Sequence, residues 1–156
     1  MYAVRLEHDV WAFAHVLMIH RDTPKHGPFI RVFQTVKPEP TWDESIAASG
    51  ERFRTFFPVA HALRDGCAVR VASMEVPEID RQWPVFKTYY DKPKSEDRTW
   101  FRTRIDGPLN EKLGDTVPDD VLDAPFARVV NLIALSRLVR TNWTHRTEVR
   151  DRDRRG

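Results

Sequence analysis

Cys67 and His61 are the one pair of side chains in this sequence whose types and spacing could support nucleophilic catalysis. A cysteine attacks as its thiolate, and a nearby imidazolium would favour that thiolate. If Arg64-Asp65-Gly66 forms a hairpin turn, the two residues flank the turn and can face each other across it. A lone cysteine at the start of a strand more often fills a small space in a core, and we favour that role for Cys67.

Patterns that bind phosphates or metals are missing from the sequence. The 6 glycines do not have the spacing of a phosphate-binding loop, which excludes Walker and dinucleotide-binding motifs. The 6 histidines form no His-x-x-x-His pair, and we expect neither a metal nor another cofactor. The acid pairs Asp119-Asp120 and Glu96-Asp97 fall in predicted loops and are typical of solvated side chains. The sequence therefore favours a binding protein over an enzyme.

Charge is distributed unevenly along the chain. Lys plus Arg number 25 and Asp plus Glu number 23, a net charge of +2. Residues 137–156 hold seven arginines against three acids, so this end carries +4 and residues 1–136 carry −2. Arginines can bind phosphates by displacing counterions. The aromatic residues that could stack on bases, if they shared an open sheet face, are Trp83, Tyr89, Tyr90, Trp100 and Phe101. Because acids interrupt the tail, a nucleic-acid-associated small β-barrel that uses this tail is our second hypothesis.

The 5 tryptophans are numerous for a chain of 156 residues. Tryptophan and tyrosine anchor protein interfaces because they bury a large area at small entropic cost. Trp11 and Trp100 fall in predicted strands, where we expect core positions. The candidates for a binding surface lie at loops or element ends: Trp42, Trp83, Tyr89, Tyr90, Trp143 and Arg98.

Length and composition indicate one soluble domain. A chain of 156 residues, 41% hydrophobic and 31% charged, can bury a core without a disulfide or a structural metal. The single Cys67 excludes an internal disulfide, which fits a reducing compartment. No apolar run is long enough to span a membrane, and residues 1–9 do not resemble a secretory signal. We expect a cytoplasmic protein.

The first half of the chain predicts two β-hairpins with a short helix between them. Residues 10–36 read as a long hairpin with turn formers at 21–28. Thr41 and Glu44 have the spacing of a capping box, which predicts a helix that ends near Gly50. Asp65-Gly66 then predicts the turn of a second hairpin, between a strand in the second half of 53–63 and a strand over 67–76.

The second half predicts two strands and a helix. Strands are expected at 85–90 and 99–105, the first at a sheet edge because of Pro84, with 109–121 mostly as loop. Asp123 as N-cap and Pro125 in the first turn predict a helix over 124–140. Apolar residues cover most of its circumference, which favours a well-buried core helix, and a helix that also contacts a partner or a second copy is the alternative.

These elements together predict an α+β, strand-rich fold. A single domain spans residues 1–142, with a bent antiparallel sheet, in one version an SH3-like partial barrel, packed against helix 124–140. Residues 143–156 form a basic, polar tail that we expect to be mobile.

Two segments resemble a known family. Residues 10–17 (VWAFAHVL) and 27–33 (GPFIRVF) resemble the opening hairpin of the immunity protein 26 family of bacterial polymorphic-toxin systems. Residues 56–59 (FFPV), 62–66 (ALRDG), 76–77 (VP) and 84–86 (PVF) are similar to that family's second half in order and spacing. The likeness covers about residues 1–90.

The likeness departs from the family at two places, Ala14-His15 and Cys67-Ala68. Its motifs are aromatics, turns and prolines, with no catalytic signature to carry over. The resemblance implies a small β-rich protein that binds a cognate toxin domain and neutralises it by direct contact. This is the function that we expect from the sequence.

Overall fold

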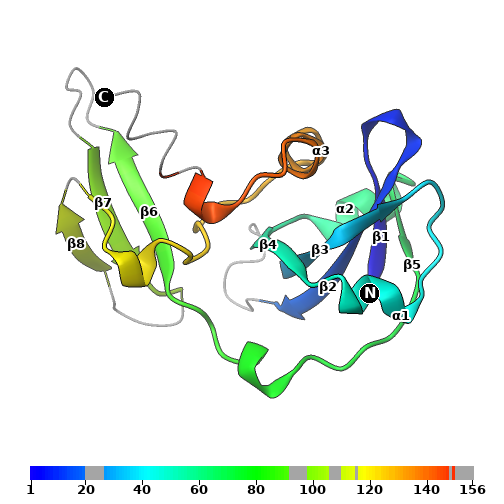
Figure 1. The fold of residues 1–156 in the computed structure, drawn as a ribbon, viewed down its shortest axis with the longest axis horizontal. Helices are drawn as coiled ribbons and strands as arrows, with labels where there is room; N and C mark the ends of the chain where they lie inside the picture. Colours follow the sequence, from blue (N-terminus) through cyan, green and yellow to red (C-terminus); the bar gives the residue numbers. More distant parts are fainter. Residues whose placement is uncertain (20–26, 92–97, 106–109, 115, 148, 150–156) are drawn as a thin grey trace. The chain divides into compact units, whose positions relative to one another are not determined.

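The chain divides into two compact units, each with its own antiparallel sheet (Figure 1). The computed structural model describes residues 1–19, 27–91, 98–105, 110–114, 116–147 and 149. Unit 1 consists of residues 1–81 and 128–143, and unit 2 of residues 82–127 and 144–156. The predicted fold class is confirmed, because the structure is α+β and strand-rich, with antiparallel sheets and a C-terminal helix.

Unit 1 is built on an open five-stranded sheet with the strand order β4-β3-β2-β1-β5. Its strands are β1 (Tyr2–Arg5), β2 (Trp11–Met18), β3 (Phe29–Lys37), β4 (Glu51–Phe56) and β5 (Ala68–Arg70). The first predicted hairpin is confirmed as the antiparallel pair β2 and β3. Most of its predicted turn, residues 21–26, lies outside the described residues.

Helices cover both faces of this sheet. Successive strand residues point to opposite faces, and in β2 Ala12 belongs to one buried cluster while Phe13 belongs to the other. The first cluster includes Leu135 of α3 (Leu132–Arg140), and the second includes Ile46 of α1 (Glu44–Ala48). Because both faces are buried, β2 is apolar on both sides apart from His15, instead of alternating with polar residues.

The predicted helix over 124–140 is too long at its N-terminal end. The observed α3 begins at Leu132, because Asn131 is its N-cap and accepts a hydrogen bond from the Ala134 amide at 2.8 Å. The backbone of the residues before Asn131 pairs with β4 instead of forming helical hydrogen bonds. The Val130 amide, for example, donates to the Phe56 carbonyl at 2.9 Å.

The second predicted hairpin is wrong. The segment expected to be its first strand is the helix α2 (Val59–Arg64), and β5 pairs with β1 instead. Gly66, with φ +68°, ends α2: its amide donates to the Leu63 carbonyl, and the Cys67 amide donates to the Ala62 carbonyl. Glycine at positive φ suits a helix C-terminus as well as a hairpin turn, so the same residue permitted both interpretations.

The short helix is confirmed, but its cap differs from the prediction. Asp43 rather than Thr41 is the N-cap, and its carboxylate accepts from the Ser45 amide at 2.9 Å. Lys37 and Ser45 donate to the same carboxylate and lower the pKa of Asp43 to about 2. Gly50 follows the helix at φ +83°, as expected.

Unit 2 contains a three-stranded sheet with the order β6-β7-β8. Its strands are β6 (Phe86–Asp91), β7 (Arg98–Thr103) and β8 (Asn110–Gly114). The first two were predicted, and β6 is an edge strand as Pro84 indicated. The assignment of 109–121 mostly to loop missed β8, because β8 is largely exposed and lacks an apolar alternation.

Of the predicted tail, Trp143 belongs to unit 1, and the described residues that follow it belong to unit 2. His145 and Val149 are buried, and Arg146 Nε donates to Asp123 Oδ1 at 3.0 Å. Lys87 is fully buried and donates to the carbonyls of Leu122 and His145. The beginning of the segment 143–156 therefore belongs to a packed structure, through contacts that its polar sequence does not indicate.

Two glycines with the same backbone conformation allow a matched test of close packing. Gly27 and Gly66 have φ of +69° and +68°. A Cβ at Gly27 would lie 2.8 Å from the Phe57 carbonyl oxygen, whereas a Cβ at Gly66 would meet nothing within 4 Å. We expect Gly66→Ala to cost roughly 1 kcal/mol of unfolding free energy. Gly27→Ala should cost at least about 1 kcal/mol more, because backbone must move.

Chemical denaturation of the two variants measures both costs, and equal losses would contradict the close approach at Gly27.

Candidate protein-interaction site

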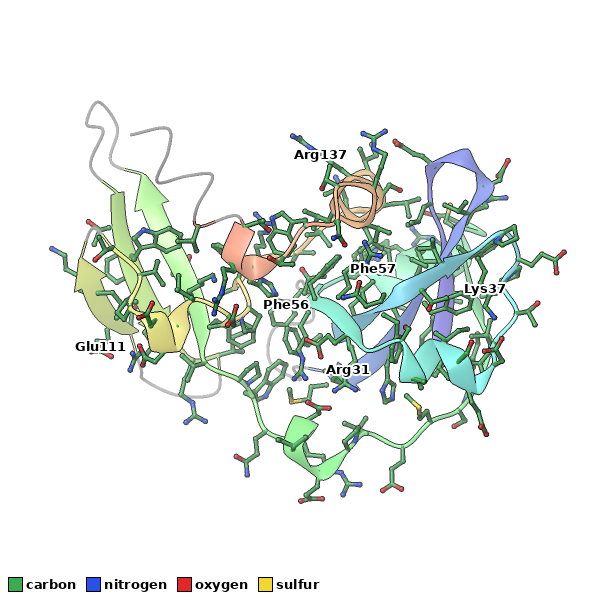
Figure 2. The ribbon with its side chains drawn as sticks, in the orientation of Figure 1. Arg31, Lys37, Phe56, Phe57, Glu111 and Arg137 are labelled. Atoms are coloured by element: carbon green, nitrogen blue, oxygen red, sulfur yellow. The ribbon has the colours of Figure 1, made fainter. Side chains whose placement is uncertain are left out.

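Arg31 on β3 and Arg54 on β4 are directly opposite each other in the sheet of unit 1. Two like charges in this position repel each other. Asp80 lies between them: its carboxylate accepts from Arg31 Nη2 and pairs with Arg54 Nη1 at 2.8 Å. Figure 2 labels Arg31 where it projects from the sheet toward the segment that carries Asp80.

Glu51 completes a cluster of two positive and two negative groups. Its carboxylate accepts from Arg31 Nε at 3.0 Å and from Arg54 Nε at 2.8 Å. Asp80 is only 2% exposed, so the cluster has a buried carboxylate at one end and the partly exposed Glu51 at the other. The two positive and two negative charges of the cluster cancel. This reduces the desolvation free energy that is lost when the carboxylate of Asp80 is buried in its ionised form.

The cluster fixes a turn on the surface of unit 1. Asp80 is the last residue of the 3-10 helix η3 (Glu78–Asp80), and its amide donates to the Pro77 carbonyl at 2.9 Å. Arg81 adds a hydrogen bond from its Nε to the Val76 carbonyl at 3.1 Å. We call residues 75–81 the anchored turn. Both its backbone and its buried carboxylate are held, so the conformation is set before any partner binds.

Ile79 is the side chain that the anchored turn presents to solvent. It is 87% exposed, the highest value among the exposed large hydrophobic side chains of the described chain. The side chains of Glu75 and Glu78 are about equally exposed, and Arg81 pairs with both. A rigid loop therefore displays one large apolar side chain inside an acidic rim.

The segment before the turn is held to the sheet as well. His15, on β2, is 2% exposed, and its Nε2 is 3.1 Å from the Met74 carbonyl oxygen. A carbonyl only accepts, so Nε2 carries the proton, and the buried Nδ1 has no partner among the described groups. Burial lowers the pKa of His15 below its ordinary value, with the Met74 hydrogen bond acting in the opposite direction.

Sequence reasoning selected other residues for the binding surface. Trp42 is half-buried against Phe13 and Phe33, with ring centroids 6.2 and 6.0 Å apart. Trp143 is half-buried against Phe53 at 5.4 Å. These two tryptophans belong to the two different clusters of unit 1, and the structure does not bring them together.

The remaining candidates belong to unit 2. Trp83 is half-buried and packs on Phe86 at 6.4 Å. Tyr89, Tyr90 and Arg98 have their backbones in β6 and β7, and their side chains lie outside the described part of the structure. Ile79 and Asp80 were missed because only the tertiary contacts of Asp80 show that this short turn is fixed.

The structure does not pair the two residues considered for nucleophilic catalysis. Cys67 Sγ is 3.6 Å from the Asp65 carbonyl oxygen, and His61 lies exposed on α2. Among the described residues, no three histidine, cysteine, aspartate or glutamate side chains are grouped so that they could hold a metal ion. In the same parts of the chain, no helix has the length and apolar character needed to cross a membrane.

Comparison of the chain with protein-family models, with curated proteins and with solved structures finds no match.

The ion cluster predicts that replacing Asp80 lowers the free energy of unfolding much more than replacing Glu51 does. Asp80→Asn leaves two opposed arginines with a buried neutral side chain, and we expect a loss of about 3–5 kcal/mol of unfolding free energy. Glu51→Gln removes a partly exposed partner and should cost about 1 kcal/mol or less. Urea denaturation measures both losses. Equal small losses would show that Asp80 does not anchor the turn.

His15 predicts a loss of stability in acid. Its pKa in the folded protein lies below the ordinary 6.5, so the unfolded chain takes up a proton first. The stability contributed by neutral His15 is complete above pH 6.5 and is lost as the pH falls below it. His15→Gln, which keeps a donor for Met74, should reduce this pH dependence, whereas the exposed-site control His61→Gln should retain it. Denaturation midpoints at pH 7.5 and 5.5 compare the three proteins.

Proposed function

We propose that this chain is a protein-binding module that neutralises a toxin domain by direct contact, in the manner of a bacterial immunity protein. The observation that supports it most is the anchored turn, which presents Ile79 on a backbone fixed by Asp80. The resemblance of residues 1–90 to the immunity protein 26 family supports the same class. We expect it in the cytoplasm, a reducing compartment that suits the single free Cys67.

A fixed turn with an exposed apolar side chain suits protein recognition for an energetic reason. Binding energy is concentrated in a few buried anchors, and ordering a mobile loop would offset part of it. The contacts of Asp80 and Arg81 order this turn before binding. Burying an exposed isoleucine in the partner then contributes roughly 2 kcal/mol to the free energy of binding, and no loop entropy is lost to offset it.

The acidic rim indicates the chemistry of the partner. Glu75 and Glu78 flank Ile79 and share one cation, Arg81, so the exposed part of the turn is slightly negative. A complementary surface has an apolar pocket for isoleucine with basic side chains beside it. Such pairs of charges at the rim of an interface act mainly on the association rate and on the choice of partner.

Two observations favour a protein partner over a nucleic acid. Arg146, in the basic tail, pairs with Asp123, so this arginine is already engaged. Trp100, one of the aromatics considered for stacking, is fully buried in unit 2. Both features weaken the nucleic-acid hypothesis, which depends on free arginines and an open aromatic face.

An exchange of one exposed isoleucine tests the proposal. Ile79→Ser removes the apolar anchor, and Ile133→Ser on α3 is the matched control, because Ile133 is 70% exposed in the same unit. Immobilised wild-type protein should capture a stoichiometric protein partner from lysate of the native host. The expected result is that Ile133→Ser retains the partner and Ile79→Ser loses it by about tenfold in affinity or more.

The same variants separate the class of partner from its contact surface. A captured protein that stops bacterial growth when expressed alone, and is harmless with wild-type chain, supports neutralisation. Salt-sensitive binding to random DNA with no protein partner would contradict the proposal. Equal capture by both variants would contradict the assignment of binding to the anchored turn.

A further inference from the structure

A cavity of about 420 Å³ lies in unit 1 beside α3, and none of its lining residues belongs to the anchored turn. Its apolar lining comes from the chain around the 3-10 helix η1 (Glu7–Asp9), from the end of β3 and from α3: Leu6, Val10, Val36 and Val139. The volume falls in the range of small-molecule sites, about 300–1,000 Å³. Apolar walls of this kind are complementary to an aliphatic chain.

Two arginines line the same cavity. Arg52 donates from Nη1 to the Val139 carbonyl at 2.7 Å and to Asn142 Oδ1 at 3.2 Å, and from Nη2 to the Gln34 carbonyl at 2.7 Å. These acceptors are neutral, and its buried Nε has no partner. Within the described chain, no carboxylate pairs with Arg52, and burial lowers the pKa of its guanidinium. The dipole of α3 compensates this charge only in part.

Arg140, the last residue of α3, is the second cation, and its side chain is exposed. One carboxylate, Glu7, also lines the cavity, but it forms no ion pair with either arginine in the part of the chain described. The Glu7 amide instead donates to Ser136 Oγ at 3.2 Å, which joins η1 to α3 at the cavity. The cavity thus combines an apolar wall with a local excess of positive charge.

We propose that this cavity binds an aliphatic monocarboxylate, with its chain against Leu6, Val10 and Val36 and its carboxylate toward Arg52 and Arg140. A guanidinium binds a carboxylate through charge-assisted hydrogen bonds, about twice as strong as neutral ones. The apolar wall adds binding free energy for each methylene group of the ligand that leaves water. A short polar anion can pair with the arginines but cannot fill the apolar wall, and an uncharged chain can fill the wall but cannot pair with the arginines. This site goes beyond the proposed function and does not depend on it.

Titration of the full chain with octanoate tests the site by NMR. The backbone amides of Val36, Ser136 and Asn142, which line the cavity, should shift together and saturate. Acetate has the charge without the chain, and octan-1-ol has the chain without the charge, so each should bind at least about tenfold more weakly. Equal binding of octan-1-ol, or no shift of these amides with octanoate, would overturn the proposal.

Two arginines on one helix provide the matched variants. Arg140→Gln removes an exposed cavity cation whose side chain forms no hydrogen bond or ion pair within the described chain, so the fold should persist, and octanoate affinity should fall about tenfold. Arg137→Gln removes an exposed charge that does not line the cavity and projects away from the sheet in Figure 2, and affinity should be unchanged. Equal affinity for Arg140→Gln and wild type would overturn the assignment of the carboxylate.

Discussion

Arg31 and Arg54 face each other across neighbouring strands of the same sheet, and their repulsion has to be neutralised for β3 and β4 to pair at this register. The chain neutralises it with one acid from β4 itself, Glu51, and one from far along the sequence, Asp80. Pairing inside the sheet therefore depends on where the segment after β5 lies. This one cluster therefore links the register of β3 and β4 to the path of the segment that presents Ile79.

The same ion cluster affects both the stability of unit 1 and the proposed binding function of the anchored turn. A buried ion pair contributes little net stability compared with apolar residues of the same size, but removing one partner is costly. Such a cluster is therefore better suited to fixing a conformation than to strengthening a fold. Here it fixes a short turn that has few apolar contacts of its own, which is the condition for presenting Ile79 in one orientation.

Local sequence signals predicted elements correctly where local chemistry decided the outcome. The hairpin of β2 and β3 follows from two apolar runs separated by turn formers, and the end of α1 follows from Gly50. They failed where tertiary contacts competed. Asp65-Gly66 ends a helix instead of joining two strands, and residues before Asn131 pair with neighbouring strands instead of extending α3.

The sequence by itself determined the strand-rich α+β class, the first hairpin and a C-terminal helix, because apolar periodicity and turn residues act over a few neighbours. Only the tertiary structure decided which surfaces are functional candidates. Asp80 is 49 residues from Arg31, and Arg140 lies far along the chain from Leu6, yet each pair shares one site. Ion pairing and cavity formation depend on distance in space, which no local pattern of residues encodes.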